Sequence, residues 1–206
     1  MRVRCLLVSL LVCLVLSGLP DEWCAAETDS PTQLVQRLVQ TIASIKAADN
    51  GLLSAEELAK NIAAAKLANT ILDVPGVSQW TLGKHWNSRS PAEQQEFVTL
   101  LEALFAKVAF PKSAEFFNDL TVNIAGERVT DKQAVVRTTV THKKEGLVSV
   151  DYRLIRHADS WRVRDILLDD VSLAMNLRSQ FNKIITEHSY AELLRRMRDK
   201  LAETSS

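Results

Sequence analysis

The sequence predicts an α+β fold in which helices come first, a four-stranded antiparallel meander follows, and helices close the chain. Three observations predict this order. Apolar residues recur at a helical spacing from Ser30 to about Phe117, alternate with polar residues from Leu120 to Leu168, and return to the helical spacing after Val171. The composition is that of a globular protein, with 206 residues of which 47% are apolar and 24% charged.

The first 26 residues have the order of a secretory signal peptide. Arg2 and Arg4 precede an apolar run, Cys5–Leu16, and small residues end at Ala26, a candidate processing site. The alternative is an N-terminal membrane anchor, but about a dozen residues fall short of the roughly 20 that a spanning helix needs. No pair of small residues stands directly before either later cysteine, which argues against lipidation.

Residues 27–206 are then expected to form one mature domain, and the cysteine count limits its chemistry. All three cysteines (Cys5, Cys13 and Cys24) lie in the signal segment. The mature chain would therefore have no disulfide, no thiolate metal site and no cysteine nucleophile. Its stability must come from a hydrophobic core, which a chain of this length can bury.

Capping signals predict the first two helices. Ser30–Pro31 supplies an N-cap and a proline at the first helical position, and Asp49–Gly51 is a stop signal. Ser54–Glu57 is a capping box that begins an alanine-rich helix, expected to end at about Thr70. Small residues in the second helix indicate close approach to another helix.

The next two helices are less regular. Val74–Gly76 is expected to break the helical pattern, and a short helix is expected over 77–86. Ser90–Glu93 is a second capping box, and it opens a helix with a wide apolar stripe. We expect Pro111 to end that helix and Phe116–Phe117 to belong to a short segment after it.

Four strands are expected next, because the apolar period falls to two and hairpin-length turns separate the segments. The strand candidates are Leu120–Val129, Gln133–His142, Leu147–His157 and Ser160–Leu168. In the third candidate, apolar side chains alternate with polar ones, which indicates a sheet with one dry face. In the fourth, Asp165 falls on the apolar phase, and a bulge or edge exposure near it would explain the slip.

Two helices are expected at the end of the chain, over about Leu173–Ile185 and Tyr190–Leu201. The last one carries an apolar stripe and a strongly basic face (Arg195, Arg196, Arg198 and Lys200). Such a face is most often a solvated surface, and the alternative is a contact with anionic headgroups or an acidic partner. No repeat or low-complexity linker divides the chain.

The sequence argues for a binding protein rather than an enzyme. Lysine and arginine together number 25, and aspartate and glutamate together also number 25, so the net charge is zero. The chain therefore lacks the surplus of basic residues that is typical of nucleic-acid-binding proteins. The histidines (His85, His142, His157 and His188) do not pair at metal-ligand spacing. No nucleophile motif or phosphate loop occurs, and Asp169–Asp170 alone is weak evidence for a cation. We expect no catalytic residue, no metal and no cofactor.

Two interpretations fit the large aromatic side chains of the mature chain, which are Trp80, Trp86, Trp161, Phe97, Phe105, Phe116, Phe117 and Tyr152. They fill a core, which is the commoner use of any single one, or they line a cavity between a curved sheet and its helices. Both arrangements need apolar residues that face inward, so the pattern leaves both open.

Six motifs between residues 77 and 203 form a recognisable combination: Leu82–Trp86, Ser90–Phe97, Tyr152–Leu154, Trp161–Ile166, Val171–Leu173 and Asn176–Phe181. Together they resemble the MlaC family, the periplasmic phospholipid-binding components of the toluene-tolerance and outer-membrane lipid asymmetry system. Two positions depart from the family pattern. Asp170 stands where glycine is frequent, and Leu177 stands where tyrosine is common.

The resemblance implies a mixed α+β cone, similar in shape to nuclear transport factor 2, with an apolar cavity. It also implies a soluble periplasmic carrier that binds a phospholipid by its acyl chains. The partners it implies are an outer-membrane lipoprotein–porin complex and an inner-membrane ABC transporter with an MCE-domain protein. A related branch implies a hopanoid or another apolar lipid as alternative cargo.

The physical chemistry of lipids agrees with this implication. Each buried CH₂ is worth about 0.8 kcal/mol, so two acyl chains of about 30 carbons cost on the order of 24 kcal/mol to hold in water. A carrier must enclose these chains while the headgroup stays wet, which predicts a monomer with an apolar cavity. Two other functions stay open: an enzyme on the same fold, and a non-catalytic scaffold of an envelope complex.

We expect the acyl chains to lie between the long helix and the dry face of the sheet. The expected lipid-binding residues are Leu82, Trp86, Phe97, Leu101, Leu104, Phe105, Val150, Tyr152, Leu154, Trp161, Val163 and Val171. Asp165 and Arg178 belong to the same motifs and carry opposite charges. A structural ion pair between them is one interpretation, and a contact to a headgroup or a partner is the other.

Overall fold

The computed structural model describes residues 29–46, 53–117, 120–142 and 146–204. The predicted signal peptide, 1–26, lies outside the described residues, as do all three cysteines. Within the described ranges, no helix is both long and apolar enough to cross a membrane. The elements run from helices through antiparallel strands to helices, which confirms the predicted α+β order.

The first two helices begin where the capping signals predict. α1 spans Pro31–Ala43, and the Ser30 hydroxyl accepts from the Gln33 N–H while the Gln33 side chain accepts from the Ser30 N–H. α2 spans Ala55–Ile71 and has the same reciprocal box at its start, with Glu57 as the returning side chain. Each box satisfies backbone donors that the first turn of a helix leaves free.

The third helix corrects a prediction. α3 spans Val74–Leu82, so the segment Val74–Gly76, expected to break the pattern, is the first turn of a helix. The cause is Asp73, whose carboxylate accepts from the Gly76 N–H at 3.4 Å and caps the helix. Proline is compatible with a first turn because no N–H is needed there. A short 3₁₀ turn, η2 (Gly83–His85), follows.

The long helix does not end at Pro111 as predicted. α4 spans Pro91–Leu104 and continues through a π-helical turn, η3 (Phe105–Ala109), into α5 (Phe110–Phe117). In an α-helix, the ring of Pro111 would collide with the carbonyl four residues earlier. The wider π turn, in which the Phe110 N–H donates to the Phe105 carbonyl, lets the chain pass the proline without stopping.

The sheet contains the four predicted strands and one more. β1 (Thr121–Val129), β2 (Gln133–His142), β3 (Gly146–His157) and β4 (Ser160–Leu168) pair antiparallel in chain order. β5 (Val171–Ser172) pairs with β4, which makes five strands instead of the predicted four. Two residues are too few to show an alternation, so the sequence pattern did not reveal β5.

The register of β4 contains the expected bulge. Leu154 of β3 pairs with Val163, whereas the preceding Arg153 pairs with Asp165, so Arg164 is the extra residue. The bulge brings Ile166 back to the face that carries Val163, because it inserts one position into the alternation. This face is the dry side of the sheet, and Asp165 faces the other side.

Tight turns with left-handed backbone join the last strands. Asp169 and Asp170 both have positive φ (45° and 66°), which suits the two-residue turn between β4 and β5. Asp170 is the position at which the sequence departs from a glycine, and its φ explains why glycine suits it. Ala158, between β3 and β4, has a φ of 48°, which is costly for a residue with a Cβ.

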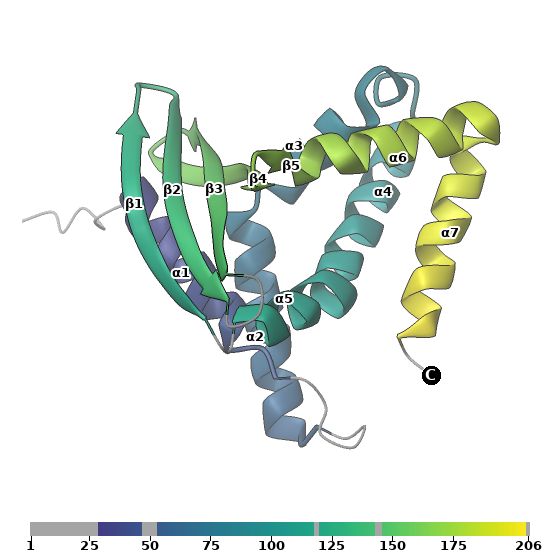
Figure 1. The fold of residues 1–206 in the computed structure, drawn as a ribbon. Coiled ribbons are helices and arrows are strands. Elements are labelled where there is room, and N and C mark those ends of the chain that lie inside the picture. The colour runs from purple at the N-terminus through teal and green to yellow at the C-terminus, as the bar shows by residue number, and fades with distance from the viewer. Residues whose placement is uncertain (1–28, 47–52, 118–119, 143–145, 205–206) are drawn as a thin grey trace, which may run out of the picture.

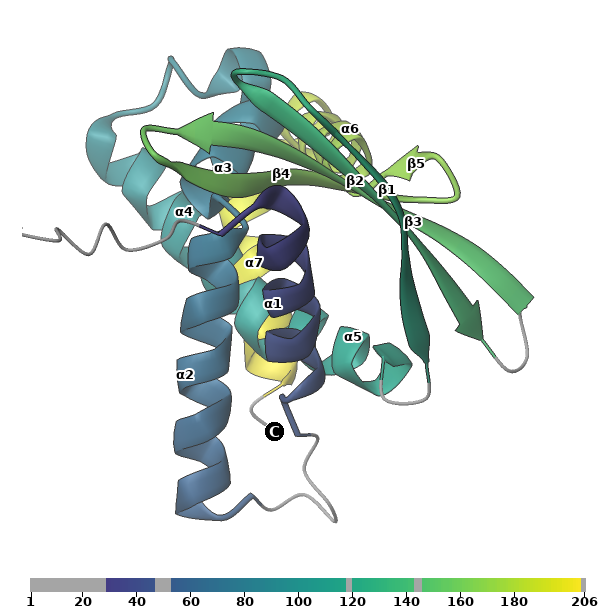
Figure 2. The same cartoon turned by 90° about the vertical axis from the view of Figure 1, so that its left-hand side faces the viewer.

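The helices cover the dry face of the sheet. In Figures 1 and 2, α1 lies against the curved sheet and α2 runs beside α1. The core between these layers is fully buried at its centre, at Leu38, Val35, Val136, Tyr152 and Leu154. One buried polar group on this face, the Thr138 hydroxyl, donates to the Val150 carbonyl at 2.7 Å, so its burial is compensated.

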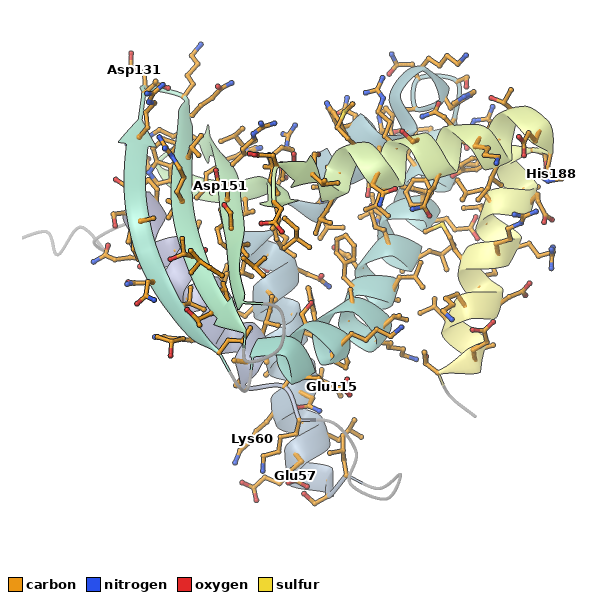
Figure 3. The ribbon with its side chains drawn as sticks, in the orientation of Figure 1. Glu57, Lys60, Glu115, Asp131, Asp151 and His188 are labelled. Carbon is orange, nitrogen blue, oxygen red and sulfur yellow. The ribbon has the colours of Figure 1, made fainter. Side chains whose placement is uncertain are left out.

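The last two helices meet at an angle at the end of the molecule that is far from the sheet. α6 (Leu173–Glu187) leads away from β5, and α7 (Tyr190–Glu203) turns back beside α4 (Figure 1). The Tyr190 hydroxyl donates to the Glu93 carbonyl at 2.9 Å and joins α7 to α4. Charged side chains gather at the periphery, as Glu57, Lys60 and Asp131 show in Figure 3.

The basic face of α7 is largely engaged by neighbouring carboxylates. Arg195 pairs with Glu192 at 2.8 Å and with Asp199 at 2.6 Å. Arg198 pairs with Glu96 of α4. These contacts favour a solvated, ion-paired surface over a free anion-binding face, although each exposed pair contributes little to stability.

Candidate functional site

An apolar cavity of about 290 Å³ lies where the sheet meets the helices. Six elements that are distant in sequence build its walls, namely α1, α3, the η3 turn, α5, β4 and α6. Its apolar lining includes Ile42, Val77, Phe105, Val163, Ile166 and Leu177. Such a lining suits hydrocarbon better than a charged ligand. The volume lies just below the roughly 300–1,000 Å³ usual for ligand pockets.

The bulge in β4 orients two walls of this cavity. It lets Val163 and Ile166 face inward and turns Asp165 toward the start of α6. There the Asp165 carboxylate accepts from the Ser172 hydroxyl at 2.7 Å and from the Ala174 N–H at 3.1 Å. A carboxylate at a helix N-terminus is stabilising, so Asp165 fixes where α6 begins and how it faces the cavity.

An ion pair closes the cavity edge between α3 and β4. Arg164 donates from Nε to Asp73 Oδ2 at 3.1 Å, and its Nη2 lies 3.0 Å from the same oxygen. Gly76 is required beside this pair, because a Cβ there would collide with the Asp73 carboxylate and approach Arg164 Nη2 to 2.8 Å. Sequence reasoning missed this pair, since no local pattern links residues 91 positions apart.

The π turn contributes to two hollows at once. Phe105 and Ala109 line the apolar cavity, whereas Ala106 and Lys107 line a larger hollow on the opposite side. The extra residue of a π turn redirects side chains relative to a regular helix, and such turns are frequent at functional sites. Phe105 also contacts Phe110 with a ring-centre distance of 6.0 Å.

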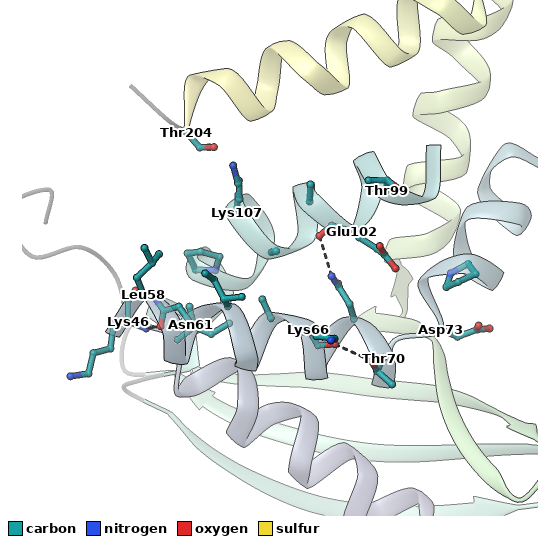
Figure 4. A pocket seen from close by; sticks show the side chains of 18 of the residues that line it. Lys46, Leu58, Asn61, Lys66, Thr70, Asp73, Thr99, Glu102, Lys107 and Thr204 are labelled. Carbon is teal, nitrogen blue, oxygen red and sulfur yellow. Dashed lines mark hydrogen bonds between the residues drawn. The ribbon is translucent and has the colours of Figure 1, made fainter. Parts of the chain in front are cut away.

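The larger hollow has a volume of about 1310 Å³ and lies between α2 and the α4–η3 segment (Figure 4). Leu58 contributes apolar surface, but Lys66, Lys107 and Glu102 stand around the same space in Figure 4. The Asn69 amide donates to the Glu102 carbonyl at 3.2 Å across the hollow. Charged and amide groups need water, so this hollow suits hydrocarbon less well than the smaller cavity.

The structure distributes the twelve expected lipid-binding residues among four environments. Phe105 and Val163 line the apolar cavity. Trp86 and Leu104 are half-buried beside the core, and Val171 is exposed on β5. The other seven are buried in the core: Leu82, Phe97, Leu101, Val150, Tyr152, Leu154 and Trp161. The cavity residues on α1, α3 and α6 were not expected, because the sequence does not show which helices converge on β4.

Asp165 and Arg178 do not form the ion pair that was one interpretation of their charges. Asp165 bonds to the start of α6, and Arg178 donates to the Trp80 carbonyl at 3.1 Å and lies 5.0 Å from the centre of the Trp80 ring. Gly83, with a φ of 54°, makes room for this guanidinium, because a Cβ would lie 2.9 Å from Nη2. Both side chains therefore have structural partners.

Two titratable side chains outside the cavity lining have shifted pKa values. Burial raises the pKa of the Tyr152 phenol far above its usual value, so it stays neutral. Burial, followed by Lys84 and Arg89, lowers the pKa of His85. Among the described residues, no group of three or more histidine, cysteine, aspartate or glutamate side chains could hold a metal ion.

Comparison with known proteins adds three findings. The structure resembles that of the phospholipid-binding protein from Ralstonia solanacearum, solved in complex with a phospholipid at 1.53 Å, with a TM-score of 0.67 and 20% identity. The match covers 85% of this chain and 96% of the other, and at this identity it establishes the fold. No curated protein matches the sequence. The family model of the MlaC protein matches residues 34–199, and the chain therefore belongs to the MlaC family.

Proposed function

We propose that this chain is a periplasmic carrier that binds a phospholipid by its acyl chains and moves it between membrane complexes. The observation that carries the proposal is the apolar cavity between β4, the π turn and α6. Membership of the MlaC family supports it. So does the shared fold with a protein that was solved with a phospholipid bound.

The free energy of hydrocarbon transfer explains why such a carrier is needed. Each methylene group removed from water contributes about 0.8 kcal/mol, so a long acyl chain does not diffuse freely through an aqueous compartment. A cavity lined by aliphatic and aromatic side chains replaces water around the chain. The headgroup can stay outside, because its charges would lose hydration inside.

We propose binding without catalysis. The two ionisable side chains at the cavity, Arg164 and Asp165, are engaged in holding the fold: Arg164 pairs with Asp73, and Asp165 caps α6. An enzyme would need a group that is free to accept or donate a proton at the substrate. Arg164 and Asp165 instead make structural contacts, so we do not propose either as an acid or a base.

The location and the partners are part of the same proposal. Residues 1–26 would direct export and be removed, which leaves residues 27–206 as the mature domain. An outer-membrane lipoprotein–porin complex and an inner-membrane ABC transporter with an MCE-domain protein would supply and receive the lipid. A carrier that serves both would act as a monomer, so that each docking face stays accessible.

A matched pair of variants in the π turn tests the proposal. Ala109→Phe places a ring in the apolar cavity, whereas Ala106→Phe places the same ring in the larger hollow on the other side. Each protein is purified from its periplasm, and its lipids are extracted and identified by mass spectrometry. We expect diacyl phospholipid with the wild type and Ala106→Phe, and a loss of at least tenfold with Ala109→Phe.

The same measurement separates the competing functions. Hopanoid in place of phospholipid would change the cargo and keep the carrier. Wild-type protein that carries no lipid, and takes up none when incubated with phospholipid, would refute the carrier and favour an envelope scaffold. Equal amounts of bound lipid in Ala109→Phe and Ala106→Phe would reject this cavity as the binding site.

A further inference from the structure

The face of the sheet opposite the helices is uncovered over β1, β2 and β3. On β2 and β3 the residues of the dry face are mostly buried, whereas Arg137 and Arg153 on the opposite face are exposed. The side chain of Arg153 is 58% exposed. In Figure 1, α1 lies behind these strands and no described helix passes in front of them. We call this uncovered side the outer face, and it is available to another molecule.

Three arginines gather on the outer face. Arg128 of β1 and Arg153 of β3 both pair with Val135 of β2, from its two sides. Arg137 follows Val135 by two residues on β2, so it lies on the same face and is a diagonal neighbour of both other arginines. Diagonal neighbours in a sheet lie about 7–8 Å apart, within reach of long side chains. We call Arg128, Arg137 and Arg153 the arginine patch.

Carboxylates within the protein neutralise this patch only in part. Among the described residues, Arg128 and Arg137 form no ion pair. Arg153 lies 3.8 Å from Asp165, whose carboxylate already accepts hydrogen bonds at the start of α6. Asp151 stands opposite Arg137 in the register, but its carboxylate accepts from a neighbouring serine hydroxyl at 3.4 Å. The patch therefore presents positive charge to its surroundings.

The arginines of α7 are arranged differently. Arg195, Arg196 and Arg198 each form an ion pair with a glutamate of α7 or α4. In the arginine patch, by contrast, like charges are neighbours on adjacent strands, an arrangement that opposes folding. A partner that placed carboxylates over the patch would relieve this repulsion and gain charge-assisted hydrogen bonds.

The position of the patch favours a protein partner over a bilayer. The apolar cavity is lined by Val163 and Ile166 on the dry face of the sheet, and the patch lies on the other face. A bilayer at the patch would meet the side of the molecule that faces away from the cavity, so lipid could not pass directly between them. A protein can hold the carrier by the outer face and leave the cavity free.

We propose that the arginine patch is a docking surface for a partner protein that presents an acidic surface. The inference rests on the proposed function and adds to it the face by which the carrier is held. Complementary charges at the edge of an interface speed association and are screened by salt. Docking through the patch should therefore weaken as the salt concentration rises.

The test compares two triple variants with the same change in charge. The first replaces all three arginines of the patch by glutamine, and the second does the same on α7, at Arg195, Arg196 and Arg198. A third variant has lysine at the three patch positions and keeps their charge. Each is titrated by biolayer interferometry, at low and at physiological salt, against two purified probes from the same organism. These are the lipoprotein–porin complex and the ABC transporter with its MCE-domain protein.

Three controls use the same proteins. Thermal unfolding followed by circular dichroism checks the fold, and mass spectrometry of extracted lipid checks the cargo. Binding to vesicles of phosphatidylglycerol tests a bilayer as the alternative partner. We expect all variants to carry as much phospholipid as the wild type, because the patch lies outside the cavity lining.

At low salt, we expect the glutamine variant of the patch to bind at least one complex about tenfold more weakly than the wild type. The α7 variant and the lysine variant should stay within about threefold for both complexes, and the loss should shrink at physiological salt. Wild-type affinity for both complexes in the glutamine variant of the patch, or an equal loss in the α7 variant, would overturn the proposal. Loss of vesicle binding alone would also overturn it and assign the patch to a bilayer.

The same data separate this inference from the proposed function. A wild type that carries phospholipid but binds neither complex would overturn the docking surface and keep the lipid-binding protein. A wild type that carries no phospholipid and takes up none would refute the proposed function itself.

Discussion

Replacing Phe97 by alanine distinguishes a core residue from a lipid contact. Phe97 was expected to touch the acyl chains, but its side chain is 0% exposed and lies outside the cavity lining. Its ring meets the edge of Phe181 on α6 at a centre distance of 5.5 Å, with the ring planes at 90°. We therefore predict that Phe97 stabilises the junction of α4 and α6.

The expected cost of Phe97→Ala follows from this packing. A buried phenylalanine truncated to alanine costs about 3–5 kcal/mol, because transfer free energy is lost and a cavity is left. In a protein of this size, each kcal/mol lowers the melting temperature by about 2–4 °C, so we expect a fall of about 6–20 °C. A double-mutant cycle with Phe181→Ala should give a coupling of about 1 kcal/mol for the edge-on pair.

The assay is urea and thermal unfolding of delipidated protein, followed by circular dichroism, with lipid binding measured well below the melting temperature. Phe105→Ala is the comparison, because Phe105 is half-buried and lines the cavity. We expect Phe97→Ala to lower the melting temperature and to bind lipid as the wild type does. We expect Phe105→Ala to reduce lipid binding strongly and to lower the melting temperature less than Phe97→Ala does. If Phe97→Ala unfolded at the wild-type midpoint but bound no lipid, the assignment to the core would be wrong.

Three further predictions concern the frame around the site. Ala158→Gly should raise the free energy of unfolding by about 1 kcal/mol, measured by urea denaturation, because Ala158 has a left-handed φ of 48°; a lower midpoint would contradict this. Asp73→Asn, which keeps a capping oxygen but loses the charge partner of Arg164, should cost about 1–3 kcal/mol in the same assay; an unchanged midpoint would mean that the pair is unimportant. The pKa of His85 is lowered from 6.5 in the folded state, so its neutral form stabilises the fold above pH 6.5 and this contribution is lost as the pH falls through the folded pKa. His85→Gln should therefore flatten the decline of stability below pH 6.5, and an unchanged pH profile would refute that role.

The helix starts illustrate what local sequence can decide. Ser30, Ser54 and Ser90 each satisfy backbone donors three residues away, so the helix begins there whatever packs on it later. The same local reasoning failed at Val74–Gly76 and Pro111. At the first, Asp73 turned a Pro–Gly signal into a helix start, and at the second a π turn carried the chain past the proline.

The amino-acid order alone determined the α+β arrangement, the alternating dry face of the sheet and the family motifs, because these depend on spacings within one element. Only the tertiary structure decided which apolar side chains fill the core and which line the cavity. Both sets look alike in sequence, and their roles depend on how α1, α3, α6 and the π turn converge on β4. Phe97 and Phe105 lie on one continuous helical segment, yet one packs against Phe181 and the other borders empty space. That difference arises from long-range packing, which no local period records.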